Sequence, residues 1–260
     1  MSTTTAVLDS PIARRDADKR PSLFRLTGVE LRKMVDTRAG FWLLAGILLL
    51  TIAVMVSRFF IDNADDSLRG FFADSSQVAQ TFLPLVGILL VTSEWTQRTS
   101  LITFALVPQR ARVLAAKLAA GVVLSAVAWV VILGIAAIGT AFAGGEPGVA
   151  TWSLPAWLIG QSAVYLAVMM LGGIGFGSML LSSAPAIVLY FATPLAFAAL
   201  GAIPALDGLA TWLDGTQTLE PLFEHSMGAS EWAHAGTTLA VWMVLPILVG
   251  LWRITRNEVQ

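Results

Sequence analysis

The chain has 260 residues, of which 56% are apolar and only 13% are charged, against about 25% charged residues in soluble domains. The formal net charge of −1 excludes the global basic field that attracts nucleic acid, so no nucleic-acid partner is expected. Cysteine is absent, which excludes disulfides, thiolate nucleophiles and cysteine-ligated zinc or iron–sulfur centres.

The longest charge-free run indicates a membrane protein. From Pro147 to Leu206 there are 60 residues without Asp, Glu, Lys, Arg or His. One membrane span takes about 20 apolar residues, so this run is long enough for two spans and a turn. The turn is expected at Ser182–Pro185, because proline suits the first turn of a helix.

The N-terminal residues 1–21 are polar and lack the apolar core of a signal peptide. We expect them to form a disordered cytoplasmic tail, with the first span acting as the retained insertion signal.

The segment Ser22–Arg38 has the pattern of an amphipathic helix. Phe24, Leu31, Met34 and Val35 fall on one helical face, with charged residues elsewhere on the wheel. This pattern favours a helix lying on the inner leaflet of the membrane. The alternative is that its basic residues are ordinary charges flanking the first span.

Residues 39–260 are expected to form a domain of six transmembrane helices, which makes the fold class an all-α integral membrane protein. The predicted spans are about Phe41–Phe60, Val78–Ser93, Leu118–Ala143, Ala156–Leu181, Pro185–Ile203 and Ala233–Trp252. Each must be helical because the backbone in lipid has to satisfy its own hydrogen bonds. Barrel strands would need short alternating segments, which this sequence does not show.

Lysine and arginine predict the orientation of these spans. Fourteen of the 16 fall in the N-terminal segment, in the loop after the second span and at the C-terminus, which all lie on one side. The positive-inside rule places that side, with both termini, in the cytoplasm and the protein in the cytoplasmic (inner) membrane.

The loop after the second span, residues 94–112, concentrates charge between two apolar segments. Trp95, Ile102 and Leu106 follow helical spacing, and Pro108 then interrupts the pattern. The sequence predicts a short cytoplasmic helix, a break and a basic return to the membrane. Arg110, Arg112 and Lys117 are expected to meet phosphate head groups there.

At these residues the chain resembles the permease subunits of type-2 ABC exporters. That family commonly shows, after its second span, a Glu, an aromatic residue, a Gly-Thr pair, a Pro, an Arg and a Lys. The matching residues are Glu94, Trp95, Thr99, Pro108, Arg110 and Lys117. Arg98 stands where the family has glycine, a departure that makes a tight turn before Thr99 less favourable. The segments Glu30–Lys33 (ELRK) and Arg253–Val259 (RITRNEV) also look like this family.

The resemblance implies a transport subunit with two partner chains. Segment 22–38 would be the elbow helix, with Arg25, Glu30, Arg32 and Lys33 at the inner leaflet. The loop 94–112 would be a coupling helix that docks on a cytoplasmic ATPase through Glu94, Trp95, Arg98, Thr99, Pro108 and Arg110. The outer loop 204–232 would carry short re-entrant helices. A second permease chain, identical or not, would complete the transporter.

The chain has no G-x-x-x-x-G-K-[ST] motif, so it lacks the loop that cradles nucleotide phosphates. The implied function is export of a small molecule or lipid-like cargo, with ATP and Mg²⁺ bound by the separate ATPase. This chain is expected to bind no cofactor and to catalyse no reaction.

The remaining candidate residues favour structural roles. Gly173 and Gly177, four residues apart, are typical of close helix packing. His225 and His234 lack a helical metal spacing, so no metal site is expected. Two other classes stay open: an intramembrane enzyme, which would need an acid, histidine or metal cluster at membrane depth, and a non-transporting scaffold or sensor subunit, which would need no ATPase.

Overall fold

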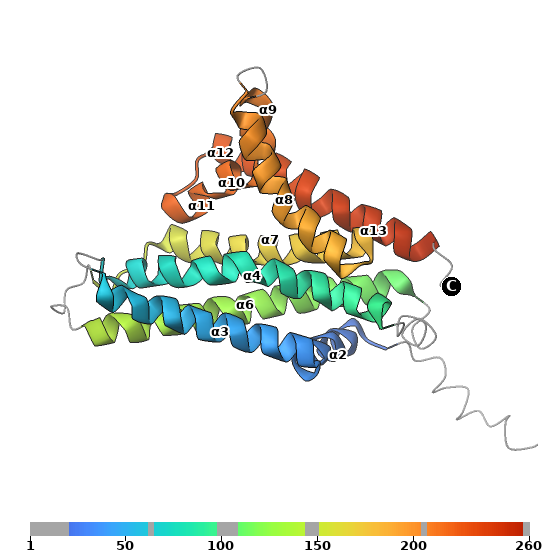
Figure 1. Cartoon of the computed structure of the whole chain (residues 1–260), viewed down its shortest axis with the longest axis horizontal. Coiled ribbons are helices and arrows are strands. Elements are labelled where there is room, and N and C mark those ends of the chain that lie inside the picture. The colour runs from blue at the N-terminus through green and yellow to red at the C-terminus, as the bar shows by residue number, and fades with distance from the viewer. Residues whose placement is uncertain (1–20, 62–64, 98–108, 144–150, 204–206, 257–260) are drawn as a thin grey trace, which may run out of the picture.

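The computed structural model of the chain describes residues 21–61, 65–97, 109–143, 151–203 and 207–256. Within these ranges, helices are the only regular secondary structure (Figure 1). Six of the helical segments are 19 to 34 residues long and apolar enough to cross a membrane. The prediction of an all-helical, multi-pass membrane protein is confirmed at that level.

The helices follow the chain in the order of the predicted elements. The first half contains α2 (Leu23–Asp36), α3 (Arg38–Ser57) with the short helix η1 (Arg58–Phe60), α4 (Leu68–Thr96) and α6 (Arg110–Ala143). The second half contains α7 (Ala156–Leu180), α8 (Ser183–Gly201), α9 (Asp207–Leu213), α10 (Gly215–Leu219), α11 (Pro221–Glu224) and α12 (Ala229–Leu239). From α12 the chain continues through the π-helix η2 (Ala240–Val244) into α13 (Leu245–Arg256), and these three form the sixth span.

Two spans begin earlier than their apolar stretches predict. α4 begins at Leu68 rather than Val78, and α6 begins at Arg110 rather than Leu118. The extra N-terminal turns of these two helices contain charged and polar residues. They are helical, although they lie outside the apolar run from which each span was predicted. The turn between the fourth and fifth spans, predicted at Ser182–Pro185, lies slightly earlier, at Leu181 and Ser182, where Leu181 adopts a left-handed φ of 55°. Ser183 to Pro185 already belong to the first turn of α8, because proline is compatible with that position.

The core of the molecule is the contact between α4 and α7, which brings the two backbones together. A Cβ atom added at Gly173 would lie 2.2 Å from the carbonyl oxygen of Pro84, and one at Gly177 would lie 3.0 Å from that of Ile88. On α4, a Cβ atom added at Gly87 would lie 2.5 Å from the carbonyl oxygen of Met170 in α7. Glycine on both helices therefore allows this approach, which no larger residue would permit without a shift.

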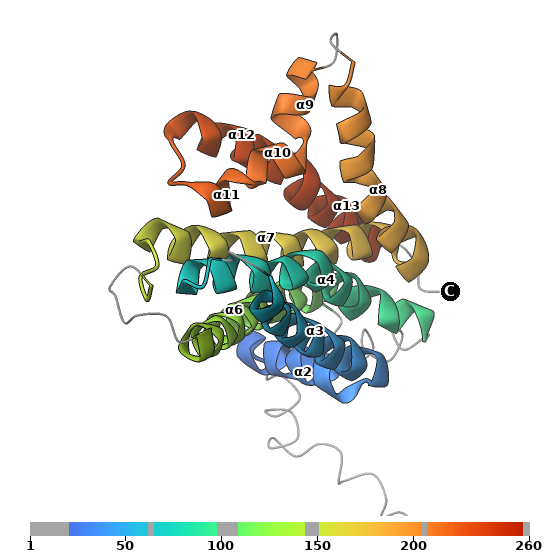
Figure 2. The same cartoon turned by 60° about the vertical axis from the view of Figure 1, so that its left-hand side comes forward.

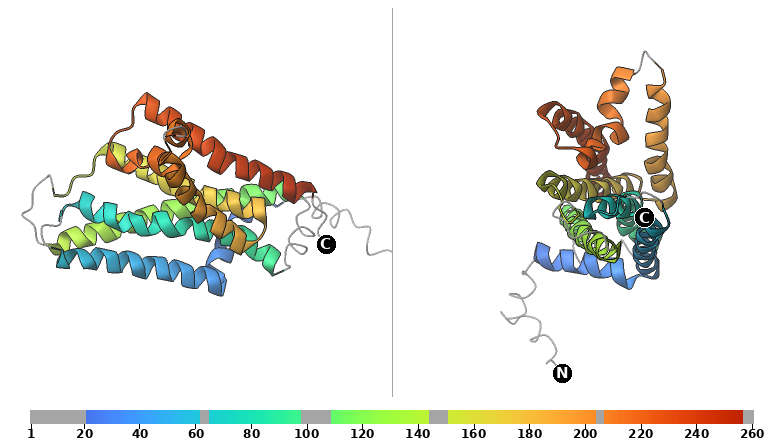
Figure 3. Two further views of the ribbon diagram at one scale, coloured as in Figure 1. Left: turned by 45° about the horizontal axis from the view of Figure 1, so that its top comes forward. Right: turned by 90° about the vertical axis from the view of Figure 1, so that its left-hand side faces the viewer.

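The other helices cover this core unevenly. α3 and α6 lie along α4 on one side, and α13 lies along α7 on the other (Figures 1 and 3). α8 starts beside α4, where the hydroxyls of Thr92 and Ser183 are 2.7 Å apart, and then leaves α7 (Figure 2). Within α8, all of whose residues are described, Ala186 is the one fully buried side chain. Large apolar faces of α3 and α8 are exposed in the single chain.

Helix α2 forms where the amphipathic segment predicts it. The Ser22 hydroxyl accepts a hydrogen bond from the Arg25 backbone N–H and caps the helix start, and Thr37 caps the start of α3 in the same way. Met34 is buried against the bundle, whereas Phe24 is 91% exposed and faces away from it. The assignment of α2 as an elbow on a membrane surface stays a prediction.

Candidate functional site

A network of four charged side chains joins α2, α4 and α6 at one end of the bundle. Its members are Glu30 and Lys33 in α2, Glu94 in the last turn of α4 and Lys117 in the second turn of α6. The Lys117 ammonium donates hydrogen bonds to Glu30 Oε2 at 2.6 Å, to Glu94 Oε1 at 2.9 Å and to the Leu90 carbonyl oxygen at 3.1 Å. We call these four side chains the charge network.

Lys33 closes the charge network on its exposed side. Its ammonium donates to Glu30 Oε1 at 2.8 Å and to Glu94 Oε1 at 2.7 Å. Two carboxylates and two ammonium groups thus alternate, and the sum of their formal charges is zero. The side chains of Glu30, Glu94 and Lys117 are 4–8% exposed, whereas that of Lys33 is 36% exposed. Compensation is necessary because an unpaired charge at this burial would be strongly unfavourable.

The environment of Lys33 favours its charged form. Burial opposes the charge, but the hydrogen bonds and Coulomb attraction of Glu30 and Glu94 outweigh burial and raise the pKa of Lys33 above its ordinary value of 10.5. Any stability that this shift provides is fully present below pH 10.5 and is lost only as the pH rises through the folded-state pKa. Lys33 therefore carries its charge throughout the physiological pH range.

Arginines at the same end connect the network to the last span. Arg110, the first residue of α6, donates to the Ile254 carbonyl oxygen of α13 at 2.7 Å. Arg253 of α13 donates to the Met179 carbonyl oxygen of α7. The half-buried Trp95 lines the same small recess as Arg110 and Ile254. α6, α7 and α13 are thereby joined at the end of the bundle that carries α2 (Figure 1).

An open groove lies beside the charge network. It has a volume of about 730 Å³ and runs between the start of α3 and the end of α4. Lys33, Arg38, Ser93 and Gln97 supply its polar groups, and Leu43 and Leu90 are among its apolar ones. This end of the molecule thus presents both charge and an apolar recess.

The structure brings together some of the residues that the sequence singled out and separates others. Glu30, Lys33 and Glu94 meet in the charge network, and Arg110 lies beside it. Arg25 and Arg32 are exposed and lie outside the network. Arg98, Thr99 and Pro108 lie outside the described residues, as do most of the predicted coupling helix and residues 1–20 of the tail.

The expectation that Lys117 meets phosphate head groups is wrong. Its side chain is only 4% exposed and pairs with the carboxylates of Glu30 and Glu94, so it does not reach the membrane surface. The reason is the early start of α6, which places Lys117 in the second turn of the helix and against α2 and α4. Arg112, by contrast, donates to the backbone oxygen of Pro21 just before α2.

The opposite end of the bundle has its own buried cation, which the sequence did not single out. Arg58 pairs with Asp74, donates to the Gly70 carbonyl oxygen at 3.2 Å and lies 5.0 Å from the centre of the Phe71 ring. At this end His225 lies 2.6 Å from Glu231. In the described parts of the chain, no three His, Asp or Glu side chains come close enough to share a metal ion.

Comparison with known proteins adds no assignment to this geometry. The sequence matches no protein-family model, and no curated protein is similar to it.

Proposed function

We propose that this chain is the transmembrane permease subunit of an ATP-driven ABC exporter. The observation that carries the proposal is the meeting of three segments that resemble this family separately in the sequence. Glu30 and Lys33 come from the first segment, Glu94, Arg110 and Lys117 flank the loop of the second, and Ile254 comes from the third. Arg110 and Ile254, which are 144 positions apart in the chain, are thus in direct contact at this end.

The charge network gives this end a mechanical role. Hydrogen-bonded ion pairs with little exposure hold α2, α4 and α6 together, so a force on the loop between α4 and α6 would act on both spans and on α2 at once. In the proposed mechanism the loop 94–112 is the coupling helix that docks on the ATPase, and α2 is the elbow on the inner leaflet. ATP and Mg²⁺ bind to that ATPase, and this chain catalyses no reaction itself.

The proposal includes the orientation and the assembly. The end with the charge network is the cytoplasmic end, with both termini there, because most lysines and arginines belong to the segments on that side. The exposed apolar faces of α3 and α8 suit contact with lipid and with a second permease chain. The cargo is a small molecule or a lipid-like molecule that crosses the cytoplasmic membrane.

The coupling role is tested by reversing a charge in the loop. We expect Arg98→Glu to uncouple ATP hydrolysis by the partner ATPase from movement of the spans. The chain contains no cysteine, so a fluorophore on Ser226→Cys can report that movement in proteoliposomes. In the parent chain the fluorescence should change with ATP, and in the Arg98→Glu variant that change should disappear while hydrolysis continues.

The matched control makes the same charge reversal at the same end but outside the loop. Arg256 is exposed near the end of α13, and Arg256→Glu should leave the response to ATP unchanged. An equal response in the Arg98→Glu variant and the parent chain would count against a coupling role for the loop.

A further inference from the structure

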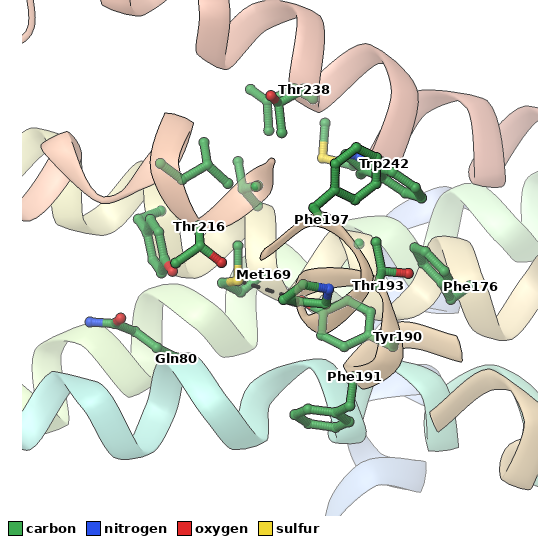
Figure 4. Close-up of a pocket in the computed structure, with 18 of the residues that line it drawn as sticks. Gln80, Met169, Phe176, Tyr190, Phe191, Thr193, Phe197, Thr216, Thr238 and Trp242 are labelled. Carbon is green, nitrogen blue, oxygen red and sulfur yellow. Dashed lines mark hydrogen bonds between the residues drawn. The ribbon is translucent and has the colours of Figure 1, made fainter. Parts of the chain in front are cut away.

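A cavity of about 390 Å³ lies between α4, α7, α8, α10 and the sixth span. Figure 4 shows its lining residues, which come from segments distant in the sequence: Gln80 from α4, Met169 and Phe176 from α7, Tyr190 and Phe197 from α8, and Trp242 from η2. Ligand sites in proteins occupy about 300–1,000 Å³, so this volume suits one small molecule.

One end of the cavity is aromatic. Phe176 of α7 has its ring centre 5.4 Å from that of Tyr190 and 6.4 Å from that of Trp242, and Phe197 lies 5.4 Å from Trp242. These rings come from three different spans, and in Figure 4 they gather on the same side of the cavity. Aromatic rings in such edge-to-face and stacked arrangements offer faces and edges to a further ring.

The other end carries uncharged polar groups. Gln80 and Thr216 lie there, away from Phe176 and Trp242 (Figure 4). No hydrogen bond from the Gln80 amide or the Thr216 hydroxyl to another described residue is seen. Among the residues that line the cavity, none is charged. Gln80 is half-buried and Thr216 is exposed, so both side chains are accessible to hydrogen-bond with a ligand in the cavity.

The walls of the cavity are shaped before any ligand arrives. The Trp242 indole N–H donates to the Leu213 carbonyl oxygen at 2.7 Å, which fixes the ring. Trp242 belongs to the π-helix η2, where the Leu245 N–H donates to the Ala240 carbonyl oxygen. Pro246 follows and has no N–H to offer the Trp242 carbonyl, which explains the wide turn. Single π turns within helices occur frequently at functional sites.

We infer that this cavity binds an uncharged, mainly apolar molecule with a ring and one or two hydrogen-bonding groups. The ring lies among Phe176, Tyr190 and Trp242, and the polar group meets Gln80 and Thr216. The absence of charge from the lining disfavours an ionised ligand, because its charge would have no partner in a low-dielectric site. If the molecule is the transported cargo, that role rests on the proposed permease function, whereas the binding itself does not.

The test uses an uncharged photoreactive probe, 4-(3-trifluoromethyl-3H-diazirin-3-yl)benzyl alcohol, with the full chain in lipid nanodiscs and without any ATPase. We expect saturable labelling at cavity residues such as Tyr190, Phe197 and Trp242, located by mass spectrometry of peptides. The matching benzoic acid, which is anionic at neutral pH, should compete at least about tenfold more weakly.

Two variants with matched controls locate the binding. Gly172→Leu extends a side chain into the cavity and should abolish saturable labelling, whereas Gly160→Leu places the same residue at an exposed position of the same helix and should not. Gln80→Leu removes the amide and should weaken binding about tenfold, whereas Gln77→Leu, at an exposed position of α4, should leave it unchanged.

Labelling that does not saturate, that spreads to exposed residues such as Phe142 and Leu195, and that persists in Gly172→Leu would overturn the inference. Equal competition by the benzoic acid would overturn the assignment of an uncharged ligand. Because no ATPase takes part, failure of this test leaves the permease proposal standing, and failure of the coupling test leaves the binding site standing.

Discussion

Replacing Lys117 with methionine is expected to lower the free energy of unfolding by about 3–5 kcal/mol, the usual cost of removing one partner from a buried ion pair. Lys117 is 4% exposed and is the only network member that contacts Glu30, Glu94 and a backbone carbonyl oxygen together. Without its ammonium, two buried carboxylates would share the single charge of Lys33. The loss can be measured by denaturant titration in detergent micelles, followed by tryptophan fluorescence.

A second substitution separates lost charge compensation from lost packing. In the double variant Lys117→Met/Glu94→Gln, one carboxylate again faces one ammonium, and part of the stability should return. Lys33→Met should be less harmful than Lys117→Met, because Lys33 is 36% exposed and water compensates for part of its removal. If Lys117→Met unfolds like the parent chain, the charge network is not what holds α2, α4 and α6 together.

The substitution Gly173→Ala should lower the free energy of unfolding by about 3 kcal/mol, at the upper end of what overpacking usually costs. The added Cβ would lie 2.2 Å from the Pro84 carbonyl oxygen and 2.7 Å from the Pro84 Cα. Both are backbone atoms, so no side-chain rotation can relieve the contact and α4 has to move away from α7. The same denaturant titration measures this loss.

Gly160→Ala is the matched control in the same helix. Nothing lies within 4 Å of a Cβ at Gly160, and alanine favours helix over glycine, so this variant should be as stable as the parent chain or slightly more stable. Equal stability of the two variants would contradict the close approach of α4 and α7 at Gly173.

The sequence predicted the spans because lipid imposes a simple rule on it. A helix in hydrocarbon must be apolar over its length, so charge-free runs reveal helices directly. The same rule does not reveal where the helices end. The first turns of α4 contain Arg69 and Asp74, which are charged yet helical, and the start of α6 carries Arg110 and Arg112. These turns lie beyond the apolar run, where charge and helix are compatible.

The sequence singled out each member of the charge network individually, but it did not predict that these residues contact one another. Lys117 and Glu30 are 87 positions apart, and Lys33 and Glu94 are 61 apart. Helical periodicity describes the faces of one helix and does not say which faces of two helices meet. The sequence predicts Lys117 at the membrane surface because the charge-free apolar run starts after it, at Leu118. Only the early start of α6 places it inside.

The cavity was harder to predict from the sequence than the charge network. It depends on the divergence of α8 from α7 after the turn at Leu181, and on the π turn that presents Trp242. Pro246 could have indicated a disturbance in the last span, but not its form or its side. The glycines were a better guide, since the four-residue spacing of Gly173 and Gly177 matches the face of α7 that contacts α4.

The most direct test of the permease proposal is to purify the chain from its native membrane in mild detergent and to identify what accompanies it. The proposal predicts a stoichiometric ATPase with a phosphate-binding loop, retained by the parent chain and lost when the charges of residues 94–112 are reversed. Recovery of the intact chain alone, across several detergents, would contradict the proposal. A non-transporting scaffold or sensor would then be the better description, and the charges of that loop would serve only to hold it at the membrane.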